Sequence, residues 1–567
     1  MVPAMRQKSI LQRKNYLGDI IFLIQIPLLI VGVAVQSPGM ICASGLIAVF
    51  HNIAYGLLEP LRRVIWTLFH LAFFLFLFGR IFVDVIFGVN LRGLFGLELQ
   101  DYIVYRIFIV LCLALWGQFL VYFGLTRKPR ERNFYVLVGG FTDFIERIFG
   151  TPFRYILKPF RALINWIKQL IGKVGDRFDR LLYRIAPRKN ADVAEFKQLT
   201  GRRDRFHFRV RIVALIVYAI SMPLHLYKVI SQIEYVAKVG YHGSYLEFNP
   251  LPRIFTVISG FFMVAYVTYL MTRPSRRGVL LVSVPYLFSL VLLLKAGQRF
   301  DISLNLLMLV CYFTLREADE RRDSVSTDPR VRMLADPRGY WISRGKVIVL
   351  IVIAVVGVVV LSIVEFTRRG SSAGNRSIPD LLTGFLITQG ISAKILGYAI
   401  SYKNFYPQLR WFTLGPVLEF VRFTVIGNWF MGQPVPTGQS IERALDGHLF
   451  SQALAYFVFP NRYLKGYGVG SGYIAELYVD FSYVGVFIGA MVYGLLIYAL
   501  GKMFSSRKLF QGVFMMFMLQ GFFFAPRASF SVFLTKAFTP RLVIGFFLIM
   551  LVARVWDRFD AAKGKPL

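Results

Sequence analysis

The stretch GYGVGSGYIAELYVDFSYVGVFIGA, residues 466–490, decides the fold of this chain, because a glycine-rich loop runs directly into an apolar segment. This stretch ends a break, residues 367–475, in a series of apolar runs of ~20 residues each, the length that an α-helix needs to cross a bilayer. On both sides of the break, apolar runs alternate with polar connections, as membrane-spanning helices require. The pattern predicts an all-α, polytopic membrane protein with one large loop.

The composition supports this fold class. The chain has 567 residues, of which 56% are hydrophobic and 16% aromatic, and its mean hydropathy is +0.57. Soluble domains of this size do not reach such values. The net charge of +35 would indicate nucleic-acid binding in a soluble protein. In a membrane protein it is better explained by cytoplasmic connections, which collect Lys and Arg during insertion.

Apolar runs and the distribution of positive charge together predict a topology of about twelve spans. Lys and Arg gather in the connections of one face, so both termini are assigned to the cytoplasm and the large loop to the periplasm. The predicted spans are residues 17–35, 40–58, 64–89, 102–125, 212–230, 254–271, 278–294, 302–315, 347–366, 474–500, 509–524 and 542–555.

The chain accordingly divides into five parts. The basic second part contains aromatic residues interleaved with Lys and Arg, which favours an amphipathic segment on the inner leaflet; a solvated basic linker is the alternative. The parts are four spans in 1–126, the basic segment 127–211, spans five to nine in 212–366, the periplasmic loop 367–475, and three spans in 476–567.

Several arginines lie on the predicted periplasmic side, against the bias of the insertion rule. Guanidinium groups bind phosphate through paired hydrogen bonds, so a lipid diphosphate headgroup is a natural ligand. The alternative for each side chain is that it reaches the phosphates of ordinary phospholipids. The candidates for diphosphate binding are Arg299, Arg527, Arg462, Arg376 and Arg443.

Acid–base groups on the same side are few. A glycosyl transfer needs a base for the attacking hydroxyl, and a carboxylate or a neutral imidazole can serve. The candidates are Glu476, His448 and Asp480, and a structural role is the alternative for each. No metal or cofactor is expected, because the sequence contains no GxxxxGKS/T, HExxH or CxxC motif and its glycine-rich stretch follows no strand.

Ionisable residues also occur inside two predicted spans. Arg80 and Asp84 are four residues apart on the third span, so they share a helical face and can form an ion pair. Arg106 lies at the start of the fourth span. All three are predicted to lie toward the outer leaflet, where such groups face a partner or a cavity.

Three segments resemble O-antigen polysaccharide polymerases of the Wzy type. They are residues 468–489, the AGQRFD turn at 296–301, and RSIPDLLTGFLITQGIS at 376–392. The resemblance covers roughly residues 278–524. It implies a GT-C-like integral glycosyltransferase of the bacterial inner membrane, whose metal-independent, inverting reaction joins undecaprenyl-diphosphate-linked repeat units into a surface polysaccharide such as O-antigen. It also implies that external arginines, Arg299 first, bind the diphosphates.

Other functions remain open at this stage. An O-antigen ligase would use the same kind of donor with a different acceptor. A transporter or flippase of lipid-linked glycan would have similar spans, although the sequence shows none of the internal repeats typical of transporters. A scaffold protein would leave the outer arginines without a common ligand. The polymerase interpretation implies lipid-linked glycan as donor and acceptor, and a chain-length regulator protein as a further partner.

Overall fold

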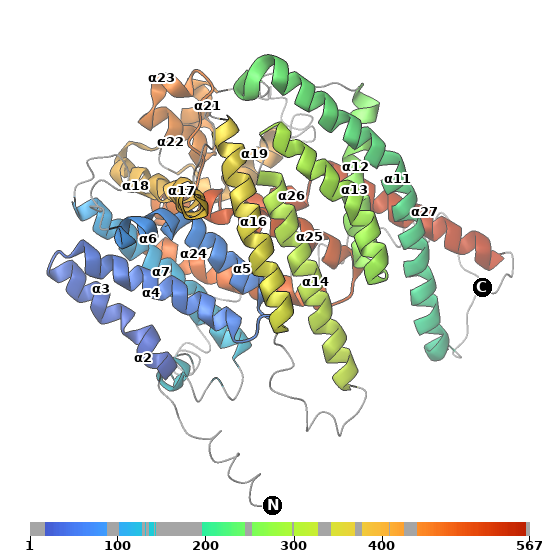
Figure 1. Ribbon diagram of the computed structural model, residues 1–567, viewed down its shortest axis with the longest axis horizontal. Coiled ribbons are helices and arrows are strands. Elements are labelled where there is room, and N and C mark those ends of the chain that lie inside the picture. The colour runs from blue at the N-terminus through green and yellow to red at the C-terminus, as the bar shows by residue number, and fades with distance from the viewer. Residues whose placement is uncertain are drawn as a thin grey trace, which may run out of the picture.

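The computed structural model describes residues 17–87, 101–127, 131, 135–140, 142, 195–243, 252–297, 300–326, 342–368, 377–407, 409–423 and 439–562. All regular structure within these residues is helical, with no strand, which confirms the all-α prediction (Figure 1). Nine of the described helices are long and apolar enough to cross a membrane. The chain is therefore a multi-pass membrane protein.

The twelve predicted spans all fall on described helices, but three of these helices are not among the nine. They are α14 (Phe300–Ser326), α16 (Arg344–Arg368) and α25 (Leu509–Phe523). The last two have apolar stretches shorter than a full span. The count of twelve stays a prediction. Most of the basic segment 127–211 lies outside the described residues.

The N-terminal helices form one packed group. Its members are α2 (Leu17–Leu23), α3 (Gln25–Ala34), α4 (Pro38–Leu57), α5 (Val64–Phe73), α6 (Gly79–Ile86) and α7 (Asp101–Thr126). Helix α4 packs against α3, α5 and α7. Helices α5 and α6 are continuous through η1 (Phe74–Phe78), a π-helical turn of the kind often found at functional sites.

A second group contains the longest helix. Its members are α11 (Glu195–Gly243), α12 (Arg253–Met271), α13 (Arg276–Lys295) and α27 (Pro540–Ala562). Helix α11 packs against the other three, and these helices lie together on the right of Figure 1. Cys42, Cys112 and Cys311 are buried free thiols.

Helix α24 (Tyr473–Ser505) contains a reversal that the sequence analysis missed. Ser482 has φ 58° and ψ −153°, which is not helical. The rings of Tyr473 and Tyr493 stack with centroids 4.4 Å apart, whereas twenty residues of straight helix would separate them by ~30 Å. Residues 473–481 therefore fold back along 483–505. The prediction of one span over 474–500 is wrong, because hydropathy records apolar length but not chain direction.

Helix α7 packs closely along this folded-back pair. A Cβ atom on Gly117 would lie 3.2 Å from that of Ala490, and one on Gly494 would lie 3.2 Å from the Cα of Gln118. The backbones approach this closely because neither glycine has a side chain. The Gln118 amide donates a hydrogen bond of 2.6 Å to the Tyr473 hydroxyl, which fixes the start of the shorter limb.

The large loop folds into short helices over one end of the bundle. They are α17 (Ile378–Gln389), η3 (Gly390–Ser392), α18 (Ala393–Ser401), η4 (Lys403–Phe405), η5 (Phe412–Leu414), α19 (Gly415–Phe423), α21 (Ile441–Asp446), α22 (Phe450–Val458) and α23 (Pro460–Tyr463). We call this end the loop-side face. Helix α17 packs on α6 and α16, and α18 packs on α7 and α24. The loop is thus built into the ends of the helices.

Candidate functional site

Glu476 lies on the shorter limb of α24 and is fully buried. Its Oε1 accepts a hydrogen bond from the Ser471 hydroxyl at 2.6 Å, and its Oε2 accepts one from the backbone N–H of Phe530 at 2.8 Å. The carboxylate joins the glycine-rich loop to the segment that follows α25. Both oxygens are occupied in this way, which is typical of a buried positioning group.

Asp480 has a similar arrangement four residues further along. Its carboxylate accepts hydrogen bonds from the backbone N–H groups of Phe412 and Thr413, at 3.2 and 2.8 Å, and from the Thr413 hydroxyl at 2.9 Å. It thereby holds η5 at the reversal of α24. The two predicted carboxylates do lie together, and their contacts favour a positioning role over proton transfer.

His448 is held by a different pair of contacts. Its backbone N–H donates to Glu419 at 2.8 Å, and its Nδ1 lies 2.7 Å from the carbonyl oxygen of Arg410. A carbonyl can only accept, so Nδ1 carries the hydrogen and Nε2 of the neutral ring keeps its lone pair. Of the three predicted acid–base residues, His448 has the atom best suited to accept a proton.

Three cations gather around η3, and we call them the η3 cation group: Arg80, Lys394 and Arg527. The backbone of Arg80 passes so close to Gly390 that a Cβ atom on this glycine would lie 2.7 Å from the Cβ of Arg80. Arg527 belongs to η6 (Ala525–Arg527) and donates a hydrogen bond of 3.0 Å to Gln389. Its guanidinium carbon also lies 5.9 Å from the ring centre of Phe76, in the π turn.

The electrostatics of this group favour an anionic ligand. Burial, and next the charge of Arg80, lower the pKa of Lys394 below its ordinary value. Asp84 lies 3.4 Å from Arg80, which confirms the predicted ion pair, and Lys394 adds a second positive charge close to this pair. Clusters of like charge that perturb a titrating group are typical of binding sites.

A second cation pair, Lys403 and Arg106, lies at the other end of α18. The Lys403 ammonium is 4.7 Å from the ring centre of Tyr478, and Arg106 lies beside the same tyrosine. Burial, followed by the charge of Arg106, lowers the pKa of Lys403. Lys394 and Lys403 are nine residues apart, which corresponds to ~13 Å of helix. The loop-side face therefore has two cationic positions.

Four predicted arginines remain, of which two are described. Arg299 and Arg376 lie outside the described residues. Arg443 is in α21, close to the Tyr463 ring, and Arg462 is in α23 with its guanidinium carbon 5.8 Å from the ring centre of Phe459. Of the three that the structure describes, Arg527 is in the η3 cation group and the other two lie outside both groups. Their roles stay predictions.

Sequence reasoning missed the two lysines of the site. Lys394 and Lys403 lie in ordinary amphipathic loop sequence, and no motif marks them. Arg80 and Arg106 did give a signal, since ionisable groups inside apolar spans face a partner or a cavity. No group of three His, Cys, Asp or Glu side chains within the described ranges could hold a metal ion.

These features define a class of protein: a polytopic membrane protein with a cationic site at the loop-side face, where a reversed helix meets a folded loop. The family model for O-antigen polysaccharide polymerase Wzy matches residues 183–558, well over half of the chain. The chain belongs to this family of O-antigen polymerases. Comparisons with curated proteins and with solved structures found no match.

The matched range has a structural consequence. It includes α11 and everything up to most of α27, and so it contains Lys394, Lys403, Arg527 and the predicted acid–base residues. It excludes α2–α7, which contribute Arg80 and Arg106. Each cationic position thus combines residues from inside and outside the matched region.

Proposed function

We propose that the protein is an integral glycosyltransferase that joins undecaprenyl-diphosphate-linked repeat units at the periplasmic face of the inner membrane. Membership of the Wzy family supports polymerisation. The observation that carries the site assignment is the η3 cation group, in which segments far apart in the sequence bring three cations together. We assign both termini to the cytoplasm from the charge bias of the connections, and with them the loop-side face to the periplasm.

The two cationic positions suit the two lipid diphosphates that polymerisation requires. In the proposed reaction, a hydroxyl of the acceptor repeat unit attacks the anomeric carbon of the growing chain. The new glycosidic bond forms as the bond to the donor diphosphate breaks, and undecaprenyl diphosphate leaves. The η3 cation group stabilises the charge on this leaving group. Lys403 and Arg106 hold the diphosphate of the acceptor.

The proton of the acceptor hydroxyl needs a base, and we assign it to Nε2 of His448. The contact between its Nδ1 and the Arg410 carbonyl fixes the tautomer that leaves Nε2 able to accept. Glu476 and Asp480 are assigned as positioning residues, because their hydrogen bonds hold the reversed helix against the loop. A chain-length regulator protein is proposed as a partner in the membrane.

Gene deletion in the host tests this function, with surface glycans separated by length. Loss of the protein should leave one repeat unit on each acceptor, and intact long chains would overturn the proposal. If the protein were a flippase, its loss would instead leave lipid-linked units on the cytoplasmic side. If it were a ligase, its loss would leave long chains on the lipid carrier. Complementation with Arg80→Gln should fail to restore long chains. The control Arg62→Gln, which changes an exposed side chain in the connection between α4 and α5, should restore them.

A further inference from the structure

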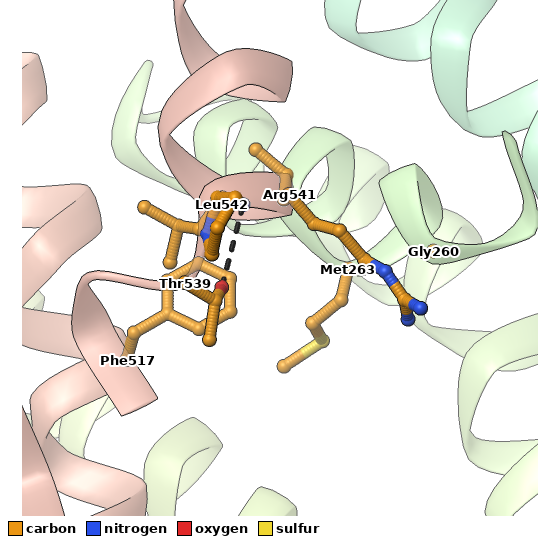
Figure 2. Close-up of a pocket in the computed structure, with 8 residues that line it drawn as sticks. Gly260, Met263, Phe517, Thr539, Arg541 and Leu542 are labelled. Atoms are coloured by element: carbon orange, nitrogen blue, oxygen red, sulfur yellow. Dashed lines mark hydrogen bonds between the residues drawn. The ribbon is translucent and has the colours of Figure 1, made fainter. Parts of the chain in front are cut away.

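A groove lies between α12, α25 and α27, and its lining includes none of the cations named above (Figure 2). Its volume is about 350 Å³, and most of its surface is apolar. The residues that line it include Gly260, Met263, Phe517, Thr539, Arg541 and Leu542. A cavity of this size is at the small end of ligand sites, so it suits one hydrocarbon chain better than two.

Arg541 lies across the mouth of the groove. Figure 2 shows its side chain extending away from Leu542 toward α12 at Gly260. A Cβ atom on Gly260 would lie 3.0 Å from the Cδ of Arg541 and 3.4 Å from its Nη1. The absence of a side chain at Gly260 is what lets the arginine occupy this position.

Two cations, Arg541 and Lys228, lie at or near the mouth of the groove. Lys228, on α11, lies within the range of electrostatic interaction with Arg541. Within the described part of the chain, no ion pair includes either cation. Helix α27 begins here, and the Thr539 hydroxyl accepts a hydrogen bond of 3.4 Å from the Leu542 N–H. A helix N-terminus adds further attraction for an anion.

We propose that the groove is an entry site for the lipid-linked substrate, with its single polyprenyl chain along α12, α25 and α27 and its diphosphate at Arg541 and Lys228. This inference rests on the proposed function, which supplies the lipid diphosphate. Helix α26 (Val532–Ala537) connects the groove to the η3 cation group, since Arg527 precedes it and Thr539 follows it.

Charge and position select this occupant. An apolar groove with cations at its mouth matches a lipid with an anionic head, and its volume holds a segment of one hydrocarbon chain. Gly260 controls access to the groove and Arg541 controls the charge at its mouth. The two variants Gly260→Leu and Arg541→Gln therefore separate filling of the groove from loss of its cation.

Photolabelling of the full chain in phosphatidylcholine nanodiscs tests the proposal, with a diazirine-bearing polyprenyl diphosphate as probe. Labelled peptides should contain Met263 or Phe517, and unlabelled polyprenyl diphosphate should compete. Arg541→Gln should reduce labelling about tenfold, as expected for loss of a charge-assisted hydrogen bond. Gly260→Leu should reduce it at least as much. The control Gly357→Leu, a helical glycine with open space around it, should label normally.

Two results would overturn the proposal. Equal competition by phosphatidylglycerol would make the groove an ordinary phospholipid site, and labelling unchanged in Gly260→Leu would place the lipid elsewhere. Labelling is measured on purified protein without polymerisation. A wild-type glycan length in Arg80→Gln would therefore contradict the proposed function without changing the labelling result. Absence of labelling at the groove in the wild-type protein would contradict the entry site without contradicting the role of the η3 cation group.

Discussion

The two ends of the helix pair α4 and α5–α6 carry arginines in opposite situations. At one end, Arg63 is buried, forms an ion pair with Glu131 and donates a hydrogen bond of 3.0 Å to the Tyr55 carbonyl. At the other end, Arg80 is partly exposed and pairs with Asp84 at 3.4 Å, while among the described residues Lys394 lies close enough to be affected by its charge. Both arginines lie at the ends of apolar helices, so sequence position alone does not separate them. Balanced charge marks a structural contact, and surplus charge marks a site for a ligand.

The neighbourhood of Arg63 is also satisfied in its neutral polar groups. The Asn52 amide lies 3.1 Å from His70 Nε2, the Trp66 indole donates to the Asn52 carbonyl at 2.7 Å, and His51 Nε2 lies 3.1 Å from the Tyr135 hydroxyl. Buried networks of this kind fix one packing arrangement when every member has a partner. These contacts, together with the ion pair of Arg63 and Glu131, hold this end of the bundle in one arrangement, and we call them the clamp.

The largest effect is expected for Arg63→Met, which breaks the clamp. Removal of one partner leaves Glu131 partly buried without its cation, and such changes cost about 3–5 kcal/mol. Thermal unfolding in nanodiscs should show a large decrease in stability. Arg62→Met is the control, because this arginine is exposed and its ion pair with Glu59 is worth less than about 1 kcal/mol. Equal stability of the two variants would show that the clamp does not hold the fold.

The second-largest effect is expected for Arg80→Gln, which should lower the rate of polymerisation and leave the stability of the fold nearly unchanged. Loss of one group that stabilises developing charge typically lowers a rate by about a hundredfold. Purified protein with lipid-linked repeat units should show this loss in chain growth, and its unfolding temperature should change little. A variant that loses stability without a specific loss of rate would place Arg80 in the same class as Arg63.

Gly390→Ala should have a smaller effect on the same site. A methyl group here would press on the Cβ and Cα of Arg80, and displacement of a packed segment costs about 1–3 kcal/mol. Polymerisation should fall about tenfold as Arg80 shifts. Gly384→Ala, on the preceding helix, meets open space and is the matched control. Equal activity in the two variants would show that the position of Arg80 does not matter.

The sequence predicted the fold well where the signal was local. Apolar runs located the helices apart from the folded-back start of α24, and the spacing of Arg80 and Asp84 predicted their ion pair. The reversal at Ser482 could not be predicted, because both limbs are apolar and neither glycine nor proline stands at the turn. Since this reversal buries Glu476 against Phe530, the role of the carboxylate could not be inferred either.

The site was less predictable because it is assembled from distant segments. Arg527 was identified from its place after an apolar run, but its position beside Gln389 depends on how the loop enters the bundle. Lys394 depends on the same packing. Its sequence context is that of any loop lysine, and only the approach of Arg80 distinguishes it. Local patterns therefore indicate cations of the helices better than cations of the loop.

The smallest expected effect concerns pH and uses this property of Lys394. Burial and the charge of Arg80 lower its pKa, so the lysine loses its proton at a lower pH than an exposed lysine does. A bound diphosphate favours the protonated form, so binding should take up a proton. Affinity should thus fall as pH rises through the lowered pKa, by at most about tenfold per pH unit for one group.

Lys394→Arg should remove this fall, because a guanidinium keeps its proton throughout the range. Calorimetric titration of the protein in nanodiscs with undecaprenyl diphosphate, at pH values from about 7 to 10, would measure the difference. Lys502→Arg, on the longer limb of α24 near its far end, is the control and should follow the wild type. A fall that persists in Lys394→Arg would move the titrating cation to Lys403. The diphosphate would then bind first at the Arg106 end of α18, and the surplus charge around η3 would serve a later step.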